Sequence, residues 1–148
     1  MKKILIAMAL AAGFTSAQAA DATVYTGRNY TTGQNLMGFN ATVFETPKLN
    51  VALGADRTVS GVDTYRFNAV AGYTFTKFMG MDVVPKLGLS YVTRNSAANG
   101  YAATAGVGLE RVLDKNITLV ADYQYQKGQD AVSALDGSIV TIGLNFKF

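Results

Sequence analysis

The last eleven residues of the chain carry its clearest hydrophobic pattern. Apolar side chains occupy every second position from Val140 to Phe148, and small or polar residues lie between them. A period of two residues is typical of a β-strand with one apolar and one polar face. The pattern recurs along the chain, and no helical period of useful length follows residue 20. We therefore predict eight strands, at Ala22–Tyr30, Asn35–Phe44, Leu49–Thr58, Thr64–Phe75, Met81–Thr93, Tyr101–Arg111, Ile117–Gln126 and Ser138–Phe148.

The two faces of these strands predict what surrounds them. About ten tilted residues is the length with which a strand crosses a bilayer. The apolar face carries no charge over its central stretch, where a charge would cost about 2–4 kcal/mol at the bilayer midplane. The other face collects charged residues and glycines, and in a narrow barrel small residues make room for longer polar ones. The sequence therefore predicts an all-β fold, an eight-stranded antiparallel up-and-down transmembrane β-barrel.

The first residues are typical of an export signal. The basic start Met1-Lys2-Lys3 is followed by the apolar run Ile4–Phe14 and by Ala17-Gln18-Ala19, a small-x-small cleavage pattern. The run is too short for a membrane-spanning helix, which needs roughly 20 residues. We expect a cleaved signal peptide at residues 1–19 and a barrel at residues 20–148.

Composition removes several classes of function. Loss of Lys2 and Lys3 would leave eleven basic and ten acidic residues, so the net charge falls from +3 to +1 and no nucleic-acid partner is implied. The chain has no cysteine and no histidine. It can form neither a disulfide, nor a Ser–His–Asp triad, nor a Cys/His metal cluster. We predict no enzyme activity, no cofactor and no metal site.

Pro85 interrupts the fifth predicted strand. Proline lacks the N–H that a ladder needs, and it is found mainly on edge strands or at bulges. We expect a β-bulge at this position.

Several segments resemble the OmpA/OmpX-like small outer-membrane barrels. Thr23–Gly27 is similar to the first strand of OmpA-like barrels, and Gly143–Phe148 is similar to the closing strand of the family. The intervening resemblance, to the sixth and seventh strands, lies in Ala105–Glu110, Leu113–Leu119 and Ala121–Tyr125.

This resemblance implies a monomeric barrel in the bacterial outer membrane. It also implies insertion by the outer-membrane assembly machinery, which reads a C-terminal aromatic strand. By that resemblance Phe148 and Phe146 are candidate assembly signals.

Charged residues of the polar face are the candidates for an interior polar network. They are Asp56, Arg66, Asp82, Lys86, Glu110 and Asp122. We expect Asp56 and Arg66 to face each other across a hairpin around Gly61. Lys86 and Glu110 should face each other across a loop at 94–100, with Asp122 one strand further on. The network either neutralises itself in a filled interior, because buried charges must be paired, or acts as a gate for small ions.

Four cations fall near the predicted outer rim: Arg28, Arg57, Arg94 and Lys127. Arginine binds phosphate in a bidentate way, so we hypothesise contact with lipopolysaccharide phosphates. Ordinary rim charge is the alternative, because Asp63, Asp130 and Asp136 share these loops. Only the loop at 127–137 has room for a structure of its own.

The sequence thus favours a small integral outer-membrane barrel protein with a structural or interaction role, through lipopolysaccharide contact and envelope integrity. Two alternatives stay open. One is a narrow ion-conducting pore. The other is a barrel subunit docked to another envelope protein through an alanine-rich lipid face.

Overall fold

The computed structural model describes residues 21–95 and 97–148, so the predicted signal peptide lies outside the described residues. Within these ranges the chain forms nine β-strands and one short 3-10 helix, η1 (Asp130–Leu135). The strands are β1 (Asp21–Asn29), β2 (Asn35–Glu45), β3 (Leu49–Thr58), β4 (Thr64–Tyr73), β5 (Thr76–Phe78), β6 (Met81–Arg94), β7 (Ala97–Asp114), β8 (Ile117–Gly128) and β9 (Gly137–Lys147). No helix in the described part of the chain is long and apolar enough to span a membrane.

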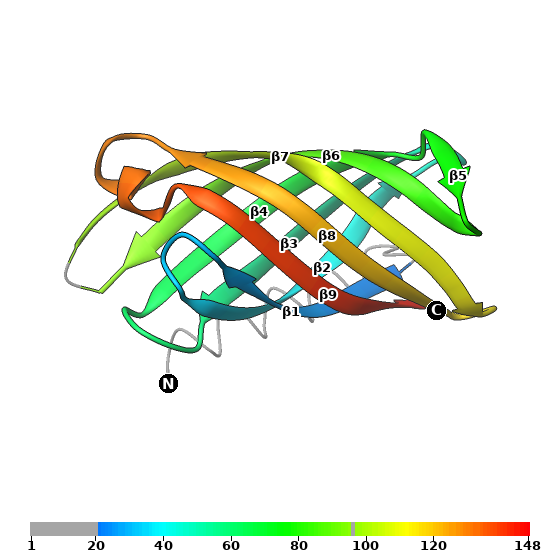
Figure 1. Ribbon diagram of the computed structural model, residues 1–148, viewed down its shortest axis with the longest axis horizontal. Helices are drawn as coiled ribbons and strands as arrows, with labels where there is room; N and C mark the ends of the chain where they lie inside the picture. Colours follow the sequence, from blue (N-terminus) through cyan, green and yellow to red (C-terminus); the bar gives the residue numbers. More distant parts are fainter. Residues whose placement is uncertain (1–20, 96) are drawn as a thin grey trace.

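The strands close into a barrel (Figure 1). Each long strand pairs antiparallel with its neighbours in sequence, β1 also pairs with β9, and β4 pairs with β6. The three-residue β5 continues β4 along the same edge of β6, so the wall has eight strands. Closure pairs both edges of the eight long strands, which is what a sheet surrounded by lipid requires. The predicted eight-stranded antiparallel barrel is confirmed.

The two ends of the barrel differ. One end, called here the terminal end, carries the start of β1, the end of β9 and the short turns at 46–48, 79–80 and 115–116. The opposite end, called the loop end, carries the connections at 30–34 and 59–63, the β6–β7 connection, and η1 (Figure 1). β7 begins at Ala97 instead of Tyr101, so strand replaces most of the expected loop at 94–100.

The irregularity expected at Pro85 lies in the neighbouring strand instead. Pro85 itself pairs in regular register with Val107. On its other side, four residue steps from Gly72 to Thr76 oppose three steps of β6, which places one extra residue between β4 and β5. The N–H of Phe75 donates to the carbonyl oxygen of Val83 at 3.0 Å, so the backbone nitrogen of Pro85 also faces this gap. The ladder is interrupted where proline has no hydrogen to donate.

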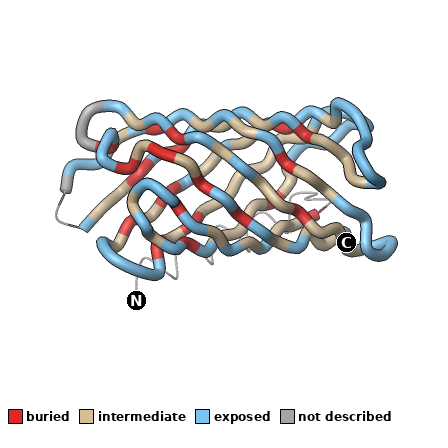
Figure 2. Tube along the Cα trace, in the orientation of Figure 1, coloured by how far each residue is buried: buried red, intermediate tan, exposed pale blue. Residues whose placement is uncertain are grey.

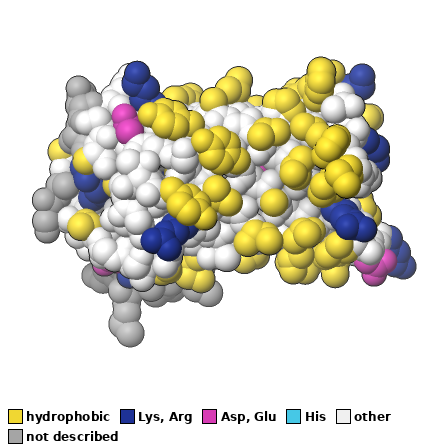
Figure 3. Space-filling view, in the orientation of Figure 1, with side chains coloured by type: hydrophobic (Ala, Val, Ile, Leu, Met, Phe, Trp, Pro, Cys, Tyr) yellow, Lys and Arg dark blue, Asp and Glu magenta, His cyan; other side chains and the backbone are white. Residues whose placement is uncertain are grey.

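Alternate residues face outward and inward along each strand, and Figure 3 shows hydrophobic side chains over the barrel wall with charged ones toward its ends. Leu87 and Leu89 are each 68% exposed, and Ile142 is 54% exposed. Leu36 and Val92 are buried at the loop-end parts of their strands, and Val84 is buried nearer the terminal end; Figure 2 shows buried positions along the barrel. The apolar side chains therefore cover the outside of the wall.

Inward glycines make room for the large polar side chains. A Cβ at Gly38 would lie 2.7 Å from the ring of Tyr25, and one at Gly108 would lie 2.8 Å from the side chain of Lys86. Contacts this short force the neighbours to move.

We expect Gly108→Val to destabilise the barrel by about 1–3 kcal/mol, because the new side chain overpacks the interior against Lys86. Urea unfolding in lipid vesicles, followed by heat-modifiable gel mobility, measures this. The control is Val107→Leu, which changes the adjacent outward side chain and should leave the unfolding midpoint nearly unchanged. Equal stability of the two variants would contradict the assignment of Gly108 to the interior.

Candidate functional site

A buried polar network fills the interior toward the loop end. The Nε of Arg66 donates to Oδ1 of Asp56 at 2.7 Å, and the two residues are direct partners in the β3–β4 ladder. Nη1 of Arg66 donates to Oε1 of Gln126 at 2.6 Å. The other carboxylate oxygen of Asp56 accepts from Nδ2 of Asn68 at 2.7 Å and from the hydroxyl of Tyr25 at 3.1 Å. Both charged side chains are nearly buried, so pairing and hydrogen bonding offset much of their desolvation cost.

Sequence reasoning missed the neutral members of this loop-end network, which are Tyr25, Asn68, Ser90 and Gln126. Ser90 Oγ donates to Oδ1 of Asn68 at 2.7 Å, and Gln126 is fully buried. All four lie on the inward parity of their strands, beside residues that were assigned inward because they are charged or glycine. The two-residue period of the strands is therefore enough to predict that these four side chains face the interior.

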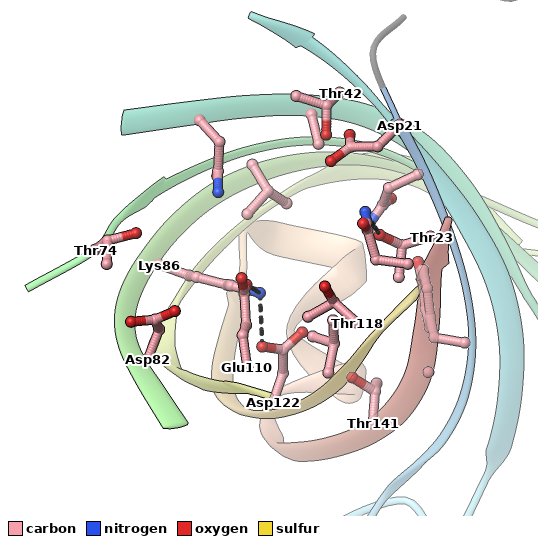
Figure 4. A pocket seen from close by; sticks show the side chains of 18 of the residues that line it. Asp21, Thr23, Thr42, Thr74, Asp82, Lys86, Glu110, Thr118, Asp122 and Thr141 are labelled. Atoms are coloured by element: carbon pink, nitrogen blue, oxygen red, sulfur yellow. Dashed lines mark hydrogen bonds and ion pairs between the residues drawn. The ribbon is translucent and has the colours of Figure 1, made fainter. Parts of the chain in front are cut away.

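A second charged cluster lies nearer the terminal end. The Nζ of Lys86 lies 2.8 Å from Oδ1 of Asp122 and 3.2 Å from Oε1 of Glu110. Figure 4 shows the three side chains pointing toward one another from the wall. We call Lys86, Glu110 and Asp122 the Lys86 cluster.

The predicted register of this cluster is wrong, because Lys86 and Glu110 are not opposite each other in the β6–β7 ladder. Lys86 pairs with Gly106, and Glu110 pairs with Asp82, so Lys86 and Glu110 are four residues apart in register. The long lysine side chain reaches along the strand over Gly108, whose lack of a Cβ leaves the space. Asp82 and Glu110 are like charges directly opposite each other, which is unfavourable by itself. Lys86 offsets the charge of Glu110.

Asp82 belongs to neither network. Its Oδ1 lies 3.4 Å from Nζ of Lys77, a residue that sequence reasoning did not single out. A second exposed pair at the terminal end joins Lys147 and Glu45 at 3.3 Å.

An interior cavity of about 440 Å³ connects these groups. Its lining includes Tyr25 and Arg66 toward the loop end, the Lys86 cluster along the wall, and Lys48 and Lys147 at the terminal end. Polar walls of this kind hold water. In the described part of the chain, no group of three or more His, Cys, Asp and Glu side chains could hold a metal ion.

The η1 segment closes the loop end of the interior. Val132 is fully buried and Leu135 is 7% exposed, and both pack with Val92 and Ala102. The carbonyl oxygen of Leu135 accepts hydrogen bonds from Nε2 of Gln126 at 3.2 Å and from Nδ2 of Asn29 at 3.1 Å. Gln126 therefore joins this lid to Arg66.

Two glycines provide the space for the lid. A Cβ at Gly100 would lie 2.5 Å from Cγ2 of Val132, and one at Gly128 would lie 2.6 Å from its backbone. The N–H of Gly128 also donates to Oδ1 of Asp136 at 2.5 Å. One of the acids expected to balance the rim cations is thus used to hold the lid.

The four rim cations lie near the loop end in different surroundings. Arg57 forms an ion pair with Asp63 at 3.0 Å, and its guanidinium lies 5.4 Å from the ring centre of Tyr65. Arg28 is exposed and lies 5.9 Å from the ring centre of Tyr30. Lys127 is exposed, and Arg94 is half-buried at the end of β6.

The two C-terminal aromatic residues lie at the terminal end. Phe146 is half-buried within β9, and Phe148 follows the last strand residue and is 88% exposed.

Comparison with known proteins identifies the fold and no closer relationship. No protein-family model and no curated protein matches the chain. The N-terminal β-barrel domain of Pseudomonas aeruginosa OprF superimposes with a TM-score of 0.69 at 20% identity, over 86% of this chain and 96% of that one. Neisserial surface protein A (NspA) superimposes with a TM-score of 0.64 at 15% identity, over 86% and 94% of the two chains. A de novo designed transmembrane β-barrel gives 0.57 at 17% identity, over 88% and 98%.

These likenesses, at 15–20% identity, define the fold alone. The fold is that of the small eight-stranded outer-membrane barrels, as the OmpA/OmpX-like resemblance implied.

We expect Arg66→Met to lower the free energy of unfolding by about 3–5 kcal/mol, because it leaves the carboxylate of Asp56 buried and unpaired. The double variant Asp56→Asn/Arg66→Met removes both charges and should recover much of that loss. Equilibrium urea unfolding in vesicles compares the three proteins. A double variant no more stable than Arg66→Met would show that the penalty does not come from the unpaired charge.

We expect Val132→Ser to weaken the packing of η1 without breaking the hydrogen bonds between the barrel strands. Hydrogen exchange of the backbone amides of Gly128 and Asp136 should become faster, while the amides of β1 and β9 keep their protection. Ala134→Ser, at an exposed position of the same helix, is the matched control. Unchanged exchange at Gly128 in the Val132 variant would mean that this side chain does not hold the lid.

Proposed function

We propose that this protein is a small integral outer-membrane barrel that acts structurally, by holding lipopolysaccharide at its outer rim and so contributing to envelope integrity. The observation that carries the proposal is the combination of an apolar outer wall with cations at the loop end. Arg28 lies there on an exposed strand end beside Tyr30, an arrangement suited to a phosphate at the membrane interface.

The proposed orientation places the loop end outside the cell. Barrels of this class have short periplasmic turns and longer outer loops. The turns at the terminal end are short, whereas the loop end carries the η1 lid. Phe148 would then lie on the periplasmic side, where the assembly machinery could bind it and the adjacent Phe146.

The rim cations contribute unequally in this proposal. Asp63 already pairs with Arg57, so part of the charge of that guanidinium is offset within the protein. Arg28 and Lys127 have no ion pair with any described side chain, which leaves them for lipid phosphates. Arg94, the last residue of β6, is the fourth candidate.

Lipopolysaccharide should stabilise the wild-type barrel more than it stabilises an Arg28→Gln/Arg57→Gln variant. The variant loses two phosphate-binding groups, and its stability in phosphatidylcholine should change little. The measurement is the urea midpoint in vesicles with and without lipopolysaccharide. A Lys48→Gln/Lys115→Gln variant removes two exposed cations from the terminal-end turns and is the control. If both variants respond to lipopolysaccharide as the wild type does, the rim does not bind its phosphates.

A narrow ion-conducting pore is the second candidate, and the cavity that opens at the terminal end favours it. In this reading the Lys86 cluster and the loop-end network are the two constrictions. Conductance of the wild type and of Lys86→Ala in planar bilayers tests it. We expect ion-sized events that increase in the variant if the cluster is a gate. No events in either protein would remove this candidate.

A further inference from the structure

The outer wall carries an apolar groove of about 600 Å³ across β4, β6, β7 and β8. The ladder register arranges its outward residues in two rungs. The rung nearer the loop end contains Ala69, Leu89, Ala103 and Lys127, and the next contains Ala71, Leu87, Ala105 and Tyr125. The two leucines of β6 therefore form a ridge, and alanines of β4 and β7 form lower floors on either side of it.

The floor on β7 is enclosed on three sides. Leu87 and Leu89, each 68% exposed, rise along one side. Tyr125 and Lys127 of β8 line the other side. Toward the loop end, the rings of Tyr101 and Tyr91 pack at a tilt of 54°, with 5.2 Å between ring centres. We call the floor formed by Ala103 and Ala105, with these walls, the alanine trough.

The width of the trough limits which kind of molecule can reach its floor. Its two walls stand on β6 and β8, which are two strand spacings apart, or about 9.6 Å between backbones. The side chains of both walls narrow that space further. An α-helix with its side chains is about 10–12 Å across, so a helix cannot reach the floor. An unbranched hydrocarbon chain can.

Lys127 adds a charge at one end of the trough. It is exposed and has no ion pair with any described side chain. It follows Ile117, at the start of β8, by ten residues, which corresponds to roughly 25 Å along the membrane normal for a strand tilted by about 40°. That height matches the apolar band of an outer-membrane barrel, so the ammonium group lies at the edge of the band, within reach of a lipid phosphate.

We propose that the alanine trough holds one acyl chain of lipopolysaccharide, with Lys127 bound to a phosphate of the same lipid. This inference rests on the proposed function and deepens it, because it adds a binding site for an acyl chain to the phosphate contacts of the rim cations. Retention of lipid A should then depend both on the open floor of the trough and on Lys127.

The test is native mass spectrometry of the mature barrel released from detergent in the presence of lipid A with two phosphates. The wild type should retain one lipid A molecule. Filling the floor in Ala103→Leu/Ala105→Leu should lower the retained fraction about tenfold, the change expected when about two methylene groups lose their contact. The control Ala55→Leu/Ala121→Leu adds the same bulk at outward alanines outside the trough and should retain lipid A normally.

The phosphate contact is tested separately with Lys127→Gln. Retention of lipid A with two phosphates should fall roughly threefold, as expected for an exposed ion pair, whereas retention of dephosphorylated lipid A should not change. Urea unfolding of every variant in phosphatidylcholine checks that the barrel is folded.

Three results would overturn the inference. The filled variant could retain lipid A as well as its control does. Phosphatidylglycerol could be retained as well as lipid A. A barrel dimer that the filled variant loses would make the trough a contact between copies. If the filled variant retains lipid A while the rim variants still lose their response to lipopolysaccharide, only the assignment of the trough is wrong. If the wild type retains no lipid A, the proposed function fails together with this inference.

Discussion

The pairing of β1 with β9 is the constraint on which the structure depends. Nine successive residue pairs, from Asp21 with Lys147 to Asn29 with Ile139, join the two ends of the chain. This contact removes the last strand edge, and in hydrocarbon an unpaired edge would leave polar backbone groups without partners. It also fixes the register around the whole ring, because a slip of one residue would exchange the two faces of a strand. Leu144 faces outward and Gly143 faces the interior for this reason.

The two halves of the narrow lumen are filled to different extents by side chains. At the loop end, Arg66 with its hydrogen-bonded partners and the lid residues Val132 and Leu135 leave little open space. Toward the terminal end the Lys86 cluster lies beside glycine, and a cavity remains. The charges are stabilised in pairs, because single charges in this space would keep most of their desolvation cost. More side chains are buried toward the loop end, and the cavity extends from the loop-end network to the terminal end.

Much of this arrangement was predictable from the sequence because a period of two constrains a barrel strongly. It gave the strand number, the outward set and the approach of Arg66 to Asp56. It could not give interactions that depend on side-chain length or on neighbouring strands. Lys86 reaches Glu110 across four positions of register, and the extra residue near Pro85 lies on the partner strand. The lid depends on space left by Gly100 and Gly128, which loop composition does not reveal.

The lumen holds a cavity that reaches Lys48 and Lys147 at the terminal end, and η1 packs at its loop end. With its open end toward the periplasm, as proposed, water around Lys86 exchanges with that compartment and not with the medium outside the cell. The ionic strength and acidity that the Lys86 cluster experiences are then those of the periplasm. Solutes that reach the cell from outside meet the packed side of Val132 and Leu135 first. In the proposed structural role the protein therefore presents packed side chains to the environment, while the water in its interior exchanges with the periplasm.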